Sequence, residues 1–99
     1  MIRHIIFVKI KGASEDEKKS NLTTLKETLD SLSPNIPEVK NYQSGFNVSN
    51  SERASDFAVI SDFESKEILD KFYNHPEYKK ILDYISSIKG RTTVVDFEF

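Results

Sequence analysis

The chain has no cysteine and no tryptophan, and it has only three glycines and three prolines among 99 residues. Without cysteine it can form no disulfide bond, no thiolate nucleophile and no cysteine-ligated metal site. Three scattered glycines make no glycine-rich phosphate-binding loop. No apolar run approaches the roughly 20 residues that a membrane-spanning helix needs. We therefore expect a small globular domain of a reducing compartment.

The chain also lacks a large excess of charge of either sign. The 14 basic and 16 acidic residues give a net charge of −2, and no basic stripe of the kind found in nucleic-acid binders is visible. The first 11 residues carry charged side chains and have no segment resembling a signal-peptide cleavage site. We predict one cytoplasmic domain over residues 1–99, with no nucleic-acid or membrane partner and no cofactor.

Four segments have the pattern of β-strands. Residues 2–11 alternate and are rich in β-branched side chains, which favours a strand over a helix. Further strands are predicted at 39–48, 55–64 and 91–99. Gly45 interrupts the second of these, and a bulge is expected there.

Three segments have the pattern of helices. Ser14, with Glu17 three residues later, predicts the start of a helix over 14–32, and leucines then recur at helical spacing. Ser65 predicts the start of a helix over 65–74, which ends before His75-Pro76. Pro76 suits the first position of a last helix over 76–89, which Gly90 is expected to end.

The resulting order, β-α-β-β-α-β, is that of a ferredoxin-like α+β domain with a four-stranded antiparallel sheet. Its helices would cover one face of the sheet, and the other face should be polar if it meets water. It is not polar in either register, because Ile5 and Phe7 alternate with Ile6 and Val8. An apolar face of this size indicates an interface. We predict a homodimer in which two sheets pack face to face around a two-fold axis.

The chain resembles the stress-responsive α/β-barrel family over nearly its whole length. The residues that carry the resemblance are Ile2 to Lys11, Ser51 to Val59, His75-Pro76-Glu77-Tyr78 and Val94-Val95-Asp96-Phe97. The resemblance implies a dimeric α+β barrel with a small apolar cavity between each sheet and its own helices. It implies little chemistry, since most members have no assigned reaction. One plant member is a polyketide cyclase, and related barrels include cofactor-free monooxygenases.

The two histidines are the candidate catalytic residues. His4 lies mid-strand on a face that the resemblance turns toward the cavity, where a neutral imidazole could act as acid or base. The alternative is a buried histidine that is simply hydrogen-bonded to its neighbours. His75 precedes Pro76 at a helix start, where its ring could line the cavity beside His4 or instead accept a hydrogen bond from a free backbone N–H.

The expected cavity favours a small apolar or aromatic ligand. We expect it to be lined by Ile6, Leu25, Phe57, Val59, Phe72 and Tyr78. The proton-transferring residues of the plant cyclase correspond to positions 72 and 78, and a further histidine corresponds to position 57. Because phenylalanine at 57 and 72 cannot transfer protons, the cyclase mechanism does not carry over.

No metal site is predicted. Asp56, Asp62, Glu64 and Asp96 fit no calcium-loop spacing and are expected to face water. Three functions remain open. The leading one is a stress-associated domain of undefined activity that binds a small ligand. The alternative is a cofactor-independent cyclase, isomerase or monooxygenase-like enzyme acting on a small aromatic or polyketide-like substrate. The third is a dimer with a filled core and a purely structural role.

Overall fold

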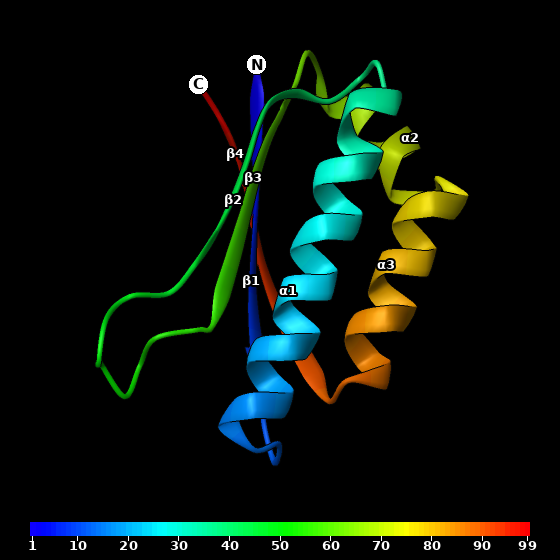
Figure 1. The fold of residues 1–99 in the computed structure, drawn as a ribbon. Coiled ribbons are helices and arrows are strands. Elements are labelled where there is room, and N and C mark those ends of the chain that lie inside the picture. Colours follow the sequence, from blue (N-terminus) through cyan, green and yellow to red (C-terminus); the bar gives the residue numbers. More distant parts are fainter.

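The computed structural model describes residues 1–99 as one sheet with helices on one face (Figure 1). The strands pair in the order β2-β3-β1-β4, and all neighbours are antiparallel. The predicted α+β fold is confirmed, and each predicted element is present to within two residues at either end. The elements are β1 (Ile2–Ile10), α1 (Glu15–Leu32), the 3-10 turn η1 (Ser33–Asn35), β2 (Lys40–Phe46), β3 (Phe57–Phe63), α2 (Lys66–Tyr73), α3 (Pro76–Ser87) and β4 (Gly90–Glu98).

Strand register decides which residues meet beneath the helices. Alternate residues of β1 from His4 to Ile10 are buried on the helix side. In antiparallel pairing, residues directly opposite each other share a face of the sheet. His4 lies opposite Ser61 on β3 and opposite Asp96 on β4. These three side chains therefore form a row across the sheet on the side that the helices cover.

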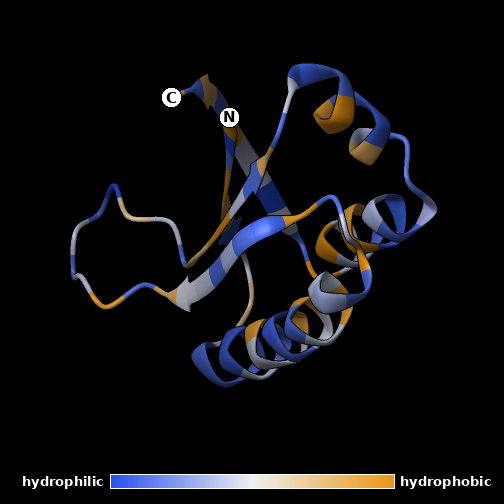
Figure 2. Ribbon diagram, turned by 90° about the horizontal axis from the view of Figure 1, so that it is seen from above, coloured by the Kyte–Doolittle hydropathy of each residue, from blue (hydrophilic) through white to orange (hydrophobic).

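Side chains at the helix starts satisfy free backbone N–H groups. Ser14 accepts a hydrogen bond from the Glu17 N–H at 3.2 Å, and Ser65 accepts one from the Ile68 N–H at 3.3 Å. No helix is both long and apolar enough to cross a membrane. Figure 2 shows all helices on one side of the strands, with the loop between β2 and β3 projecting away from both.

Two of the predicted roles for glycine are wrong. The irregularity of β2 lies between Lys40 and Gln43 rather than at Gly45, which pairs with Ala58 in the ordinary way. Asn41 takes the left-handed conformation there, with φ of 47°. At the end of α3 it is Lys89, with φ of 61°, that turns the chain, and Gly90 already belongs to β4.

The sheet face away from the helices is uncovered. Antiparallel pairing places Phe7, Val95 and Phe97 on this face, and their exposed fractions are 38%, 48% and 42%. Ile5, opposite Val95, and Ile60, on the other side of Ile5, share this face and are half-buried. We call these five residues the open face. Only 16 of the 99 residues are buried, so the single core beneath the helices is thin and the open face holds much of the remaining apolar surface.

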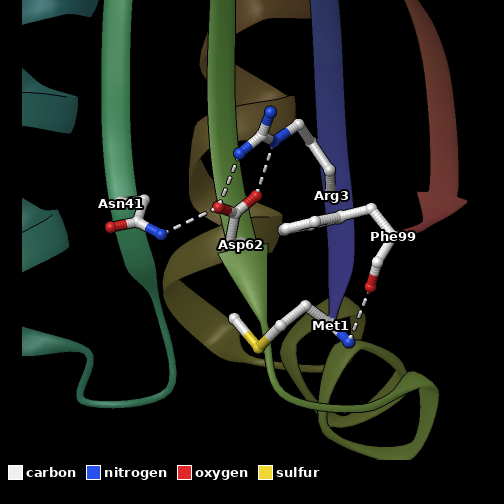
Figure 3. A network of polar contacts seen from close by, with 5 residues as sticks. All are labelled: Met1, Arg3, Asn41, Asp62 and Phe99. Carbon is white, nitrogen blue, oxygen red and sulfur yellow. Dashed lines mark hydrogen bonds and ion pairs between the residues drawn. The ribbon is translucent and has the colours of Figure 1, made fainter.

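One of the aspartates that were expected to face water, Asp62, does not. Asp62 is 0% exposed, because it accepts hydrogen bonds from Arg3 and Asn41 at the edge of the open face (Figure 3). Asp96 bonds with His4 on the opposite face. Burial of the Asp62 carboxylate is tolerated because it has more than one hydrogen-bond donor. The Asp96 carboxylate has two partners as well, but its side chain stays 28% exposed.

Candidate functional site

A cavity of about 60 Å³ lies between the sheet and the helices. Its floor comes from β1 and β3, its walls from α1 and α3, and one end from η1 and β2. Five of the six residues expected to line it do so: Ile6, Leu25, Val59, Phe72 and Tyr78. Phe57 is buried but is not among the lining residues. It sits at the first position of β3, where its ring packs on Phe46 with the centroids 5.5 Å apart.

His4 is the main polar group of this cavity. Its side chain is 1% exposed, and four aromatic rings surround its ring at centroid distances of 5.3 to 6.2 Å. The four are Phe63, Phe72, Tyr73 and Tyr78. The prediction that His4 points toward the helices is confirmed. Such packing allows the imidazole little freedom to turn.

The two ring nitrogens of His4 have different surroundings. Nδ1 bonds with Asp96 Oδ1, and the Tyr73 hydroxyl lies 3.2 Å from the same nitrogen. Because an ionised carboxylate can only accept, Nδ1 must carry a proton. Nε2 has no hydrogen-bond partner and is the one buried side-chain nitrogen or oxygen of the chain in this condition. The cavity that His4 lines is the space that could hold a partner for Nε2.

Tyr73 is the third member of a hydrogen-bonded group that also contains His4 and Asp96, which we call the His4 group. Its hydroxyl donates to Asp96 Oδ2 at 2.5 Å, so the two carboxylate oxygens are bound by two different side chains. Burial, and then the hydrogen bond to Asp96, raises the pKa of Tyr73. Burial, with Asp96 nearby, raises the pKa of Tyr78 to about 12. Both hydroxyls therefore keep their protons at neutral pH, and Tyr73 is the donor in its bond to Asp96.

The sequence profile of the stress responsive A/B barrel domain matches residues 2–99. The chain belongs to this family. No curated protein matches the sequence.

Solved structures resemble this stress responsive A/B barrel domain along its full length. A dimeric protein of unknown function with a ferredoxin-like fold, from Bacteroides fragilis, is 23% identical, with 99% of this chain and 95% of that chain covered and a TM-score of 0.87. A dimeric ferredoxin-like protein of unknown function from Thermobifida fusca is 26% identical, with 99% and 90% covered and a TM-score of 0.77. Hydroxynitrile lyase from Passiflora edulis is 18% identical, with 97% and 90% covered and a TM-score of 0.77.

His75, the second candidate base, lies elsewhere in this barrel domain. It is half-buried, and its Nδ1 accepts a hydrogen bond from the Glu77 N–H at 3.1 Å at the start of α3. It is neither a cavity-lining residue nor one of the rings around His4. The structure thus does not bring the two histidines together, and the geometry of His75 is that of a helix cap.

Sequence reasoning missed Asp96 and Tyr73 as members of the His4 group. For Asp96 the only signal available was the alternating pattern of the last strand, and the pairing that places it opposite His4 is seen in the structure. For Tyr73 there was none, because its reach to Asp96 depends on where α2 crosses the sheet. No group of three or more histidine, aspartate or glutamate side chains is close enough to hold a metal ion.

Proposed function

We propose that this stress responsive A/B barrel domain binds a small, mostly apolar molecule in the cavity, with His4 Nε2 as the polar anchor. The observation that carries the proposal is the unpartnered Nε2 of a histidine that lines a cavity. A buried polar atom without a partner costs about 1–3 kcal/mol, which a ligand that hydrogen-bonds to it would recover. A filled core with a purely structural role has no use for such an atom.

The size of the cavity limits the ligand. About 60 Å³ is several times the space that one water molecule needs, and well below the roughly 300–1,000 Å³ of sites for larger ligands. An apolar cavity of about 150 Å³ is known to take benzene. The volume therefore favours the smallest of the ligands that the sequence suggests, an aliphatic molecule of a few heavy atoms, over an aromatic ring.

We also propose that the domain acts as a homodimer whose subunits meet through the open face. Three large apolar side chains are substantially exposed there, and burial of such a surface is the main driving force for association. The relatives from Bacteroides fragilis and Thermobifida fusca are described as dimeric. The cavity lies on the other side of the sheet, so each subunit would keep its own site.

A second candidate function is that of a cofactor-independent enzyme with His4 as the base. Asp96 at Nδ1 supports it, because a carboxylate there orients the ring and stabilises the imidazolium that forms when Nε2 takes a proton. A hydroxynitrile lyase is among the proteins with this fold. His75 is less suited to this role, since its Nδ1 is already occupied by the Glu77 N–H.

Thermal melting tests the binding proposal. Wild type and His4→Phe are melted with small alcohols, ketones and nitriles, and we expect a concentration-dependent rise in Tm for wild type that His4→Phe loses. His75→Asn is the matched control, because asparagine can also cap a helix and position 75 is outside the cavity. If no compound stabilises wild type, or if His4→Phe responds equally, His4 is not the anchor.

Proton exchange tests the enzyme candidate. Nitroethane is a small neutral carbon acid, and NMR in D2O follows the loss of its α-protons. A base at His4 Nε2 should accelerate this exchange in wild type and not in His4→Phe, while His75→Asn should match wild type. Equal rates for wild type and His4→Phe would exclude His4 as a base toward this class of substrate.

A further inference from the structure

We infer that the cavity selects neutral molecules that donate a hydrogen bond, such as an alcohol, and that Tyr73 is the positioning residue that fixes this selectivity through Asp96 and His4. The inference rests on the proposed function for the location of the ligand. It adds the chemical class of the ligand and a role for a residue outside the cavity lining.

The first step concerns the proton on His4. Asp96 accepts at Nδ1, so the neutral imidazole has its hydrogen on Nδ1 and a lone pair on Nε2. The aromatic rings around His4 oppose a flip that would exchange the two nitrogens. The buried anchor is thus an acceptor, and the group that satisfies it must be a donor.

The second step concerns Tyr73. The Asp96 side chain is 28% exposed, and without a second partner its carboxylate could turn toward water. The Tyr73 hydroxyl holds Oδ2 at 2.5 Å, while its ring contacts the His4 ring at a centroid distance of 5.3 Å. One side chain therefore fixes both members of the pair, and Oδ1 remains opposite Nδ1.

The third step concerns charge and the other polar groups of the cavity. Asp96 lies next to the cavity, and no lysine or arginine is among the lining residues, so a bound anion would meet no cation there. Glu77 also lines the cavity, but its carboxylate is paired with the Lys80 ammonium at 3.2 Å on the exposed side. Ser61 and Tyr78 bring hydroxyl groups, which can turn to donate or accept. The buried group that is unpartnered and of fixed sense is His4 Nε2, which accepts. With no cation among the lining residues, it favours a neutral donor over a ketone or a carboxylate.

Nitrogen-15 NMR of the histidine rings tests the positioning step without any ligand. We expect wild-type His4 to have its proton on Nδ1 and a bare Nε2, and Tyr73→Phe to show a mixture of the two tautomers. Tyr84→Phe is the matched control, because it also removes a tyrosine hydroxyl that donates within the fold, to the Asn21 carbonyl at 3.3 Å, but Tyr84 is neither a lining residue nor bonded to Asp96 or His4. A proton on Nε2 in wild type, or an unchanged tautomer in Tyr73→Phe, would overturn the inference.

Three molecules with four heavy atoms each test the ligand class: 2-propanol, acetone and acetate. We expect 2-propanol to shift the Nε2 resonance and to bind about three- to tenfold more tightly than acetone, with acetate weakest. Tyr73→Phe should reduce the difference in affinity between 2-propanol and acetone, and Tyr84→Phe should keep it. Equal binding of all three, or tightest binding of acetate, would refute the selectivity and the role of His4 Nε2 as acceptor, and would leave only the binding of small molecules in the cavity standing. Binding of none would count against the proposed function, while the tautomer measurement would still decide the role of Tyr73.

Discussion

The Arg3 guanidinium donates two hydrogen bonds to the Asp62 carboxylate, from Nε to Oδ1 at 2.8 Å and from Nη2 to Oδ2 at 3.0 Å (Figure 3). Asn41 donates a third, also at 3.0 Å. The donors of Arg3, and then of Asn41, hold the pKa of Asp62 below its ordinary value. A carboxylate that is 0% exposed thus stays ionised at the edge of the open face.

The first prediction is that this network makes the fold sensitive to acid. Because the pKa of Asp62 is lower in the folded protein than in the unfolded chain, its ionised carboxylate stabilises the fold at pH values above the ordinary pKa of aspartate, ~4. That contribution is lost as the pH falls through the folded-state pKa. Asp62→Asn should therefore cost about 1–3 kcal/mol at neutral pH, and the cost should shrink below about pH 4. Urea unfolding at several pH values measures it. The control is Glu64→Gln, at an exposed position just after β3, and a cost for Asp62→Asn that does not change with pH would contradict the argument.

The second prediction concerns Gly90. A β-carbon at this position would lie 2.6 Å from Ile85 Cγ2 and 2.8 Å from the Ile85 carbonyl oxygen, so backbone would have to move. Gly90→Ala should destabilise the domain by about 1–3 kcal/mol in chemical denaturation. Gly45→Ala is the matched control, because nothing lies within 4 Å of a β-carbon there, and it should be neutral or slightly stabilising. Equal effects of the two changes would mean that α3 and β4 are not as close as described.

The third prediction concerns the open face. Phe7→Glu or Ile60→Glu would place a charge among apolar side chains that a second copy is proposed to cover, so we expect monomers or unfolded protein. Sedimentation velocity with circular dichroism distinguishes these outcomes from a folded dimer. Val48→Glu is the control, because Val48 is 96% exposed in the loop between β2 and β3, and it should leave the assembly unchanged. Wild-type-like dimers from both sheet variants would refute this interface.

The fourth prediction separates the structural role of His75 from a catalytic one. His75→Ala removes the acceptor at the start of α3 and should cost about 0.5–2 kcal/mol, whereas His75→Asn should restore most of it. Thermal denaturation measures both. Neither change should alter ligand binding in the cavity. A stable His75→Ala protein that has lost binding would return His75 to the list of site residues.

The elements of the fold could be predicted because their signals are local. Caps at Ser14 and Ser65, the break at Pro76 and the alternation of the strands each depend on a few neighbouring residues. The face that His4 shares with Ile6 and Val8 followed from the same alternation. The irregularity near Asn41 could not be located from local pattern, because Asn41 turns to donate to Asp62, which is 21 residues away in the sequence.

The candidate site could be predicted only in part, because some of its contacts join residues that are far apart in the sequence. The apolar lining could be anticipated from the spacing of residues on strands and helices. The bond of His4 to Asp96 joins residues 92 apart and depends on the register of β1 against β4. The contribution of Tyr73 also depends on where α2 ends above the sheet. The sequence pattern made both His4 and His75 candidate catalytic residues. Only the packed structure shows that His4 lines the cavity and that His75 caps a helix.

The most direct test of the central claim is to locate a bound small molecule by intermolecular NOEs. With 2-propanol near saturation, its methyl protons should give NOEs to Ile6 on the sheet and to Ile81 on α3, which line opposite sides of the cavity. The same NOEs should be absent in His4→Phe. NOEs confined to Phe7 and Phe97 on the open face, or none at all, would show that the cavity beneath the helices is not a binding site.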